Sequence, residues 1–294
     1  MEIVEKISAG LLAIKEQKPL VHHLTNYVTV NDCANIVLAI GASPVMADDL
    51  EEVEEMVALA KALVLNIGTL NSRTVGSMLA AGKKAKALGL PVILDPVGVG
   101  ATKLRTKTAL AIMREVQPDV IRGNLSEIKI LGGEAAAIKG VDSADQSHLA
   151  EIKSLAVTLA LKLGAVIAIT GKTDVVTNGQ KTYAIDNGHP LLAQITGTGC
   201  MATSLAGAYC AALNERDYLA GAAGGIMTMG LAGEMALSVV GGQQSGVREK
   251  NRLPLTPDDR QLTTGIGTYK CRLFDAVFNL TPAQIKEGAK IYAC

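Results

Sequence analysis

Apolar and polar positions along the chain follow two alternating patterns. Short apolar runs are separated by longer stretches with helical periodicity. The short runs predict strands at residues 20–24, 44–46, 62–66, 91–94, 120–122, 166–170 and 175–177. The longer stretches predict helices at residues 30–40, 50–59, 74–88, 109–115, 126–131, 148–163, 201–213 and 219–240. This alternation favours βαβ units, so we predict an α/β fold with a mainly parallel central sheet flanked by helices.

The segment 175–184 departs from this alternation. Asn178-Gly179 stands between alternating residues, which predicts a hairpin and a late antiparallel ribbon. Neither a Pro- or Ser-rich linker nor an internal repeat divides the sequence. We therefore expect one domain over residues 1–294.

The segment Gly197-Thr198-Gly199-Cys200, followed by small apolar residues at 201–208, predicts a glycine turn that opens into a helix. The first N–H groups of a helix lack internal partners and carry partial positive charge, so this turn suits a phosphate or an oxyanion. Cys200 falls in the first turn, where the helix dipole is expected to lower a thiol pKa. We therefore predict catalytic roles for Gly197, Gly199 and Cys200.

Other interpretations of glycine-rich segments compete with this one. A glycine-opened helix with a buried cysteine is common in α/β cores. Gly197-x-Gly199-x-x-Ala202 also fits a dinucleotide-binding fingerprint, but Asp217, at the required distance, leads into a helical stretch instead of ending a strand. Gly171-Lys172-Thr173 resembles the end of a Walker A loop, yet Val166 stands where the first glycine is needed and a hairpin follows.

Charge and cysteine content narrow the possible partners and location. The 28 basic and 28 acidic residues balance without a basic block, which argues against nucleic acid. Five cysteines without a C-x-x-C spacing argue for a reducing compartment and against a structural zinc site. The N-terminus lacks a signal-type apolar core, and the uncharged stretch 218–233 is too short for a membrane span. We expect a cytoplasmic protein without a membrane partner.

Polar residues cluster where the predicted strands end, and ligands of such sheets bind beyond those ends. These residues are Asn26, Asn66, Asp95, Arg122, Asn124 and Thr170. Asp95 and Glu127 are hard oxygen ligands suited to Mg²⁺, although Asn124 and Glu127 also form a plausible capping box. Arg122 is suited to bidentate phosphate binding. With the anion-binding turn, this set predicts phosphoryl transfer.

Six segments together resemble the hydroxyethylthiazole kinase family, in the family's order and over roughly residues 1–240. They are LTNYV at 24–28, GASPVM at 41–46, LDPVGVGAT at 94–102, RGNLSEI at 122–128, ITG at 169–171 and GTGC at 197–200. The resemblance implies a ribokinase-like fold and a homotrimer with active sites at the subunit interfaces. It also implies transfer of the ATP γ-phosphate to the alcohol of 4-methyl-5-(2-hydroxyethyl)thiazole, in thiamine biosynthesis and salvage.

Residue roles follow from the same resemblance, position by position. It implies thiazole contacts from Met46, Gly197 and Asn26, ATP contacts from Arg122 and Thr170, and positions near the magnesium for Asp95 and Glu127. Cys200 stands where related sugar and pyrimidine kinases carry an aspartate base. Because a thiol is a poorer proton acceptor, we hypothesise that Cys200 orients the alcohol while positioning supplies most of the rate.

The sequence departs from the family near its end. The polar segment 241–267 is longer than usual and is expected to be a surface insertion, although it could instead cover the nucleotide site. Residues 265–269 resemble the family's Gly-Pro-Gly-Ser-Phe turn without its proline. Adjacent His22 and His23 face opposite sides of a strand, so at most one faces the site. Cys33, Cys210, Cys271 and Cys294 are expected to be packing or surface residues.

Three alternative functions stay open. A kinase of the same fold could phosphorylate another small alcohol such as a hydroxymethylpyrimidine, but Cys200 and the SPVM segment at 43–46 argue against it. A dehydratase of this fold repairs hydrated nicotinamide dinucleotides, and its lyase product would distinguish it. A silent nucleotide-binding regulator would bind ATP without turnover.

Overall fold

The computed structural model describes residues 2–133, 146–213, 216–238 and 265–294. Within them, a nine-stranded sheet has the order β2-β1-β3-β4-β5-β6-β7-β8-β9. The strands are β1 (Leu20–Leu24), β2 (Ser43–Val45), β3 (Ala62–Asn66), β4 (Val92–Asp95), β5 (Val120–Asn124), β6 (Val166–Thr170), β7 (Asp174–Thr177), β8 (Thr182–Ile185) and β9 (Ile291–Ala293). Pairing is parallel from β2 to β6 and antiparallel from β6 to β9. The predicted fold class and the late hairpin are therefore confirmed.

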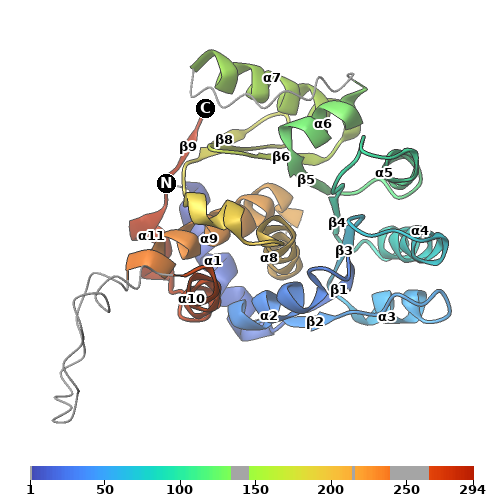
Figure 1. Ribbon diagram of the computed structural model, residues 1–294, viewed down its shortest axis with the longest axis horizontal. Coiled ribbons are helices and arrows are strands. Elements are labelled where there is room, and N and C mark those ends of the chain that lie inside the picture. Colours follow the sequence, from blue (N-terminus) through green and yellow to red (C-terminus); the bar gives the residue numbers. More distant parts are fainter. Residues whose placement is uncertain (1, 134–145, 214–215, 239–264) are drawn as a thin grey trace, which may run out of the picture.

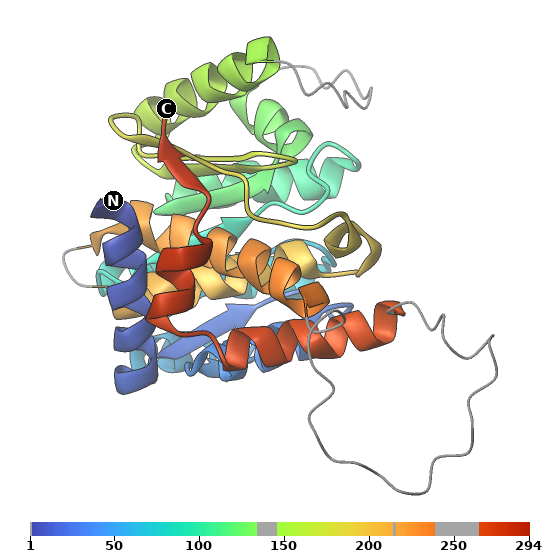
Figure 2. The ribbon, with the colours of Figure 1, turned by 90° about the vertical axis from the view of Figure 1, so that its left-hand side faces the viewer.

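Helices cover both faces of the sheet (Figure 1). One face carries α1 (Glu2–Gln17), α2 (Val30–Ile40), α8 (Thr198–Ala212), α9 (Tyr218–Ser238), α10 (Ile266–Phe278) and α11 (Pro282–Gly288). The other carries α3 (Val53–Leu59), α4 (Ser72–Ala87), α5 (Lys103–Glu115), α6 (Leu125–Gly132) and α7 (Gln146–Leu163). A 3₁₀ helix, η1 (Pro190–Gln194), precedes α8. Figure 2 shows α11 lying against α1, so the C-terminal segment folds back onto the first helix.

The two faces of the sheet bury two separate apolar cores. Alternate residues of a strand point to opposite faces, so Val64 of β3 packs toward α8 while Leu63 and Leu65 pack toward α4. Strands buried on both faces are apolar along their whole length, which explains why the parallel half of the sheet gave the clearest sequence signal.

Helices α8 and α9 are buried on nearly all sides. They are apolar all round, as expected for helices inside a core. In the described part of the chain, none of the helices combines the length and apolarity that crossing a bilayer needs. The backbones of α8 and α9 approach so closely that a Cβ added to Gly225 in α9 would overlap the backbone nitrogen of Ala206 in α8. This close packing holds the start of α8 in place at the edge of the sheet.

Several elements escaped sequence prediction. Helix α1 was missed although Ile3, Ile7, Leu11 and Ile14 repeat with helical spacing and are all buried. Helices α10 and α11 and strand β9 were also missed. Helix α5 begins at Lys103 and not at residue 109, because Thr102 caps it by accepting a hydrogen bond from the Arg105 N–H (3.2 Å).

The segment 265–269, which resembles the family's turn before a closing helix, forms the start of α10. Gly265 is the N-cap of α10, and the helix continues through Tyr269. The hydroxyl of Tyr269 donates to the carbonyl of Gly233 in α9 (3.0 Å) and anchors the helix. The rest of the predicted insertion, up to residue 264, lies outside the described residues.

We expect Gly225→Ala to destabilise the fold by roughly 1–3 kcal/mol, because the new methyl group meets backbone and cannot be accommodated by a rotamer change. Gly76→Ala in α4 is the matched control. Its Cβ would meet nothing within 4 Å, so it should stabilise the helix by about 0.5–1 kcal/mol. Urea unfolding of both variants measures the difference, and equal effects would contradict this account of the α8–α9 packing.

Candidate active site

The candidate site lies where the carboxyl ends of the central strands meet the N-terminus of α8. Asn66 and Asp95 end the adjacent strands β3 and β4 and are paired in register. Thr170 ends β6 and is paired with Asn124 of β5. Helix α8 packs over β1, β3 and β4 and starts at this edge. Side chains that are far apart in sequence therefore converge at the position typical of ligand sites in α/β sheets.

Two glycines allow the start of α8 to fit tightly against its neighbours. Gly197 is the N-cap, with a left-handed φ of 92°, and an added Cβ would be 3.1 Å from the Cβ of Thr29. At Gly199 an added Cβ would lie 2.6 Å from Nη1 of Arg122. The left-handed backbone and the contact with Thr29 require glycine at position 197, whereas a side chain at position 199 would displace the Arg122 guanidinium. The predicted glycine turn that opens into a helix is confirmed, and Cys200 lies in its first turn.

The sulfur of Cys200 receives two amide donors. The Nδ2 of Asn26 lies 3.4 Å from Sγ, and the Nδ2 of Asn66 lies 3.2 Å from it. The orientation of both amides is fixed by backbone N–H groups, which can only donate: Thr29 N–H donates to Oδ1 of Asn26 (3.1 Å), and Gly68 N–H to Oδ1 of Asn66 (2.9 Å). The Nδ2 of Asn26 also donates to Oδ1 of Asn66 (2.9 Å). Asn26 therefore donates to Asn66, and both amides donate to Sγ of Cys200.

The pKa of Cys200 shifts in the direction opposite to our sequence expectation. Burial raises the pKa of the thiol, and the nearby Asp95 carboxylate raises it further, while hydrogen bonds from Thr29, Asn66 and Asn26 oppose the rise. Cys200 is thus a thiol at neutral pH. The prediction of a lowered pKa was wrong because it considered the helix start alone, and not the core that buries the side chain.

Asp95 is a fully buried carboxylate with one oxygen to spare. Its Oδ2 accepts hydrogen bonds from Nδ2 of Asn66 (3.0 Å) and Oγ1 of Thr203 (2.8 Å), whereas Oδ1 has no partner. Burial raises the pKa of Asp95 to about 6, although Arg122 counteracts the shift. Nη1 of Arg122 lies 3.9 Å from Oδ2. An unpartnered carboxylate oxygen of this kind is suited to a cation.

Arg122 and Thr170 form a second pair at the same edge. Nη2 of Arg122 donates to Oγ1 of Thr170 (2.7 Å), and the two residues come from the adjacent strands β5 and β6. The Nε of Arg122 is buried without a partner. The guanidinium therefore keeps donor capacity for an anion beside the start of α8.

The carboxylate of Glu127 is already held by backbone donors. Oε1 accepts from the Gly98 N–H (2.8 Å) and Oε2 from the Asn124 N–H (2.8 Å). The predicted capping box of Asn124 and Glu127 is confirmed. Glu127 thereby ties the loop after β4 to the start of α6. Among the residues that the structure describes, no group of three or more His, Cys, Asp or Glu side chains is placed to hold a metal ion.

Met46 and the histidine pair lie apart from this cluster. Met46 directly follows the edge strand β2, and β1 separates that strand from the one carrying Asn66. His22 is buried against the carbonyl of Ala47 (2.6 Å), and burial lowers the pKa of His23 to about 4. The other cysteines match expectation, since Cys33 and Cys210 are buried and Cys271 and Cys294 are exposed.

Comparison with known proteins identifies the family. A model of the hydroxyethylthiazole kinase family matches residues 11–250. The chain belongs to the hydroxyethylthiazole kinase family. It is 48% identical to a hydroxyethylthiazole kinase of Clostridium tetani and 50% identical to one of Alkaliphilus oremlandii, with 99% of each chain covered in both comparisons. The predicted family is confirmed. The chain is therefore a kinase, with ATP as its co-substrate.

Solved structures support the same assignment. The structure of a hydroxyethylthiazole kinase from Pyrococcus horikoshii is 36% identical, with a TM-score of 0.82 and 99% of both chains covered. Two more distant structures share the fold alone. A pyridoxal kinase from Staphylococcus aureus is 16% identical, with a TM-score of 0.52 and with 73% of this chain and 87% of that one covered. A ribokinase-like protein from Enterococcus faecalis is 12% identical, with a TM-score of 0.55 and with 94% of this chain and 89% of that one covered. The predicted ribokinase-like architecture is confirmed.

Asn66 is central to this kinase's cluster, although the sequence placed it only among the polar residues at strand ends and assigned it no role of its own. It is buried and makes four hydrogen bonds, two as donor and two as acceptor, to Asp95, Cys200, Asn26 and Gly68. Its only sequence signal was its position at the end of a predicted strand, which is equally typical of a turn residue. The pairing of β3 with β4 reveals its central place.

We expect Asn66→Asp to lower kcat by at least about tenfold, or ~1.4 kcal/mol, because the carboxylate keeps both acceptor contacts but loses the donors to Cys200 and Asp95. Asn187→Asp is the matched control: Asn187 is also buried, and its Nδ2 donates to the Gly288 carbonyl (2.8 Å), far along the sheet. Steady-state rates per folded molecule, with thermal unfolding alongside, measure both. Similar rates for the two variants would contradict a special role for Asn66.

Proposed function

We propose that this chain transfers the γ-phosphoryl group of ATP to the alcohol of 4-methyl-5-(2-hydroxyethyl)thiazole, with Mg²⁺ as the metal. The observation that carries the proposal is the hydrogen-bonded chain from Asn26 and Asn66 to Cys200 and Asp95, beside the Arg122–Thr170 pair. It combines a hydrogen-bonded thiol, a free carboxylate oxygen and an arginine–threonine pair suited to phosphate at one sheet edge. Phosphoryl transfer needs this kind of positioning more than covalent chemistry.

On the acceptor side, Asn26 and Gly197 bind the thiazole and Cys200 orients its alcohol. Met46 lies apart from this cluster within one chain, so its thiazole contact depends on the interface sites of the homotrimer proposed below. A neutral thiol has two lone pairs, and the amide donors of Asn26 and Asn66 occupy them. The S–H is then available as a donor to the alcohol oxygen. In this state Cys200 is a poor general base, so alignment of the alcohol supplies most of the rate.

On the nucleotide side, Arg122 and Thr170 bind the phosphates of ATP. The first N–H groups of α8, at Gly197 to Cys200, point their partial positive charge at the group in transfer. Because Gly199 brings this helix start within contact of Arg122, both sources of positive charge act on the same anion.

Magnesium fits Asp95 better than Glu127. Asp95 has a buried oxygen without a partner, whereas both oxygens of Glu127 accept backbone N–H groups. We infer that Asp95 contacts the ion, directly or through water, and that Glu127 shapes the loop beside it. Mg²⁺ commonly takes most of its ligands from phosphates and water, and it would offset the negative charge of the nucleotide.

We also propose a homotrimer with active sites at the subunit interfaces. Tyr27 and Val28, next to Asn26, are 79% and 59% exposed, which is unusual for apolar residues beside an active site. Light scattering coupled to size exclusion tests the assembly. The cytoplasmic location stays a prediction.

An assay with ATP, Mg²⁺ and the thiazole, read by mass spectrometry, tests the proposed activity. We expect the thiazole to gain one phosphate. A phosphorylated pyrimidine alone would favour the alternative kinase, a repaired dinucleotide would favour the dehydratase, and ATP binding without any turnover would favour the silent regulator. Omission of Mg²⁺ should abolish the product.

Cys200→Asp should preserve or raise turnover, because a carboxylate accepts the amide donors and still has a lone pair for the alcohol proton. Cys271→Asp on the exposed surface of α10 is the control and should leave turnover unchanged. A loss beyond about a hundredfold, or ~2.7 kcal/mol, in folded Cys200→Asp protein would contradict the positioning role.

A further inference from the structure

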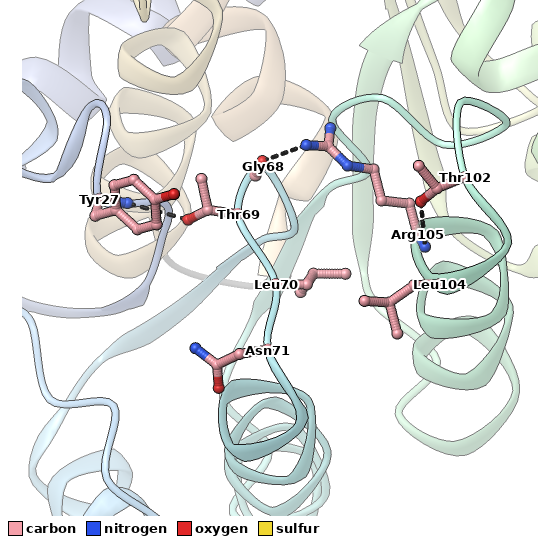
Figure 3. Close-up of a pocket in the computed structure, with 8 residues that line it drawn as sticks. All are labelled: Tyr27, Gly68, Thr69, Leu70, Asn71, Thr102, Leu104 and Arg105. Atoms are coloured by element: carbon pink, nitrogen blue, oxygen red, sulfur yellow. Dashed lines mark hydrogen bonds between the residues drawn. The ribbon is translucent and has the colours of Figure 1, made fainter.

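A pocket of about 320 Å³ lies between the loop after β3, at residues 68–71, and the start of α5 (Figure 3). Tyr27 and Gly68 form one wall, and Leu104 and Arg105 at the start of α5 form the other. The guanidinium of Arg105 reaches across to the backbone of Gly68. Arg105 lies outside the Cys200–Asp95 cluster and is not one of the site residues discussed above.

We propose that Arg105 is a positioning residue that fixes the loop after β3, on the acceptor side of the site, to the loop after β4, on the metal side. Its Nη2 donates to the carbonyl of Gly68, after β3 (2.6 Å), and its Nη1 to the carbonyl of Val97, after β4 (2.9 Å). One planar group thus sets the distance between two backbone segments. The proposal rests on the roles assigned to Cys200, Asp95 and Glu127 under the proposed function.

On the acceptor side, Gly68 connects Arg105 to the amide chain. Its carbonyl accepts from Arg105, and its N–H donates to Oδ1 of Asn66 (2.9 Å). A Cβ on Gly68 would lie 2.9 Å from Nδ2 of Asn26, so the backbone here is in contact with both amides. Any shift of Gly68 therefore moves the two groups that hold the sulfur of Cys200.

On the metal side, Val97 lies in the short loop that follows Asp95. The next residue, Gly98, has a left-handed φ of 70° and donates its N–H to Oε1 of Glu127 (2.8 Å). A Cβ on Gly98 would overlap Nη1 of Arg105. The arginine is therefore packed directly onto the backbone that links Asp95 to Glu127.

An arginine suits this task better than a lysine. Both acceptors are neutral carbonyl oxygens on different loops, and a rigid fork reaches the two at once, whereas an ammonium is a single point on a flexible stem. Helix α5 also holds the residue firmly, because the N–H of Arg105 is bonded to its N-cap Thr102.

Arg105→Ala in the full chain tests the proposal. We expect kcat/KM for the thiazole to fall at least tenfold through a higher thiazole KM and a lower kcat, with the KM for ATP within twofold of wild type. Millimolar guanidinium chloride, far below denaturing concentrations, should restore several-fold of the loss by occupying the vacated pocket. Arg114→Ala is the matched control on the same helix, since Arg114 is exposed and pairs with Glu115. It should show neither loss nor rescue.

Backbone amide exchange provides a readout that does not depend on activity. Arg105→Ala and Arg105→Lys should both exchange faster than wild type at residues 67–71 and 96–100, and Arg105→Lys, which keeps the charge, should also lose thiazole kcat/KM. Unchanged exchange in these loops, or thiazole kcat/KM within twofold of wild type in Arg105→Ala, would overturn the proposal. The proposal would also be overturned by a loss of thiazole kcat/KM that guanidinium does not restore and that comes with higher KM values for both thiazole and ATP. If wild type leaves the thiazole unphosphorylated, the proposed function fails, while the exchange comparison still decides the role of Arg105.

Discussion

The close approach of α8 to the sheet and to α9 is the constraint on which the site depends. Gly207 brings α8 within van der Waals range of Val64 in β3, and Gly225 brings α9 onto the backbone of Ala206. A helix held on both sides in this way has little freedom to slide, since protein cores are densely packed. Its first turn is therefore fixed at the carboxyl edge of the strands, and this also fixes the positions of Gly197, Gly199 and Cys200.

Burial gives the site its chemical character as well as its geometry. Asp95 is held without solvent and with one oxygen unbonded, and burial raises the pKa of this carboxyl to about 6. The same burial keeps Cys200 protonated. A buried carboxylate with an unpartnered oxygen is costly to fold, so a fully satisfied, uncharged residue in the place of Asp95 would make the fold more stable.

The parallel half of the fold was predictable because its strands are short, mostly apolar runs separated by helical patterns. β1, β3 and β6 match their predicted ranges, whereas α10 and β9 were missed because the packing that fixes them involves residues distant in sequence. The site was predictable only in part. GTGC at 197–200 and Asp95 carry local signals, but the centrality of Asn66 follows from strand pairing, and the two carbonyls reached by Arg105 belong to loops that no spacing rule connects to it.

The sheet has an edge at β2, and Pro44 lies in the middle of that strand, paired with Val21. Proline offers no backbone N–H, so a neighbouring strand cannot complete a regular ladder along the outer side of β2. Edges blocked in this manner resist uncontrolled growth of the sheet into larger aggregates. Any second copy that meets the molecule near Met46 must therefore be recognised by its side chains, and association at this edge becomes a matter of surface shape instead of strand extension.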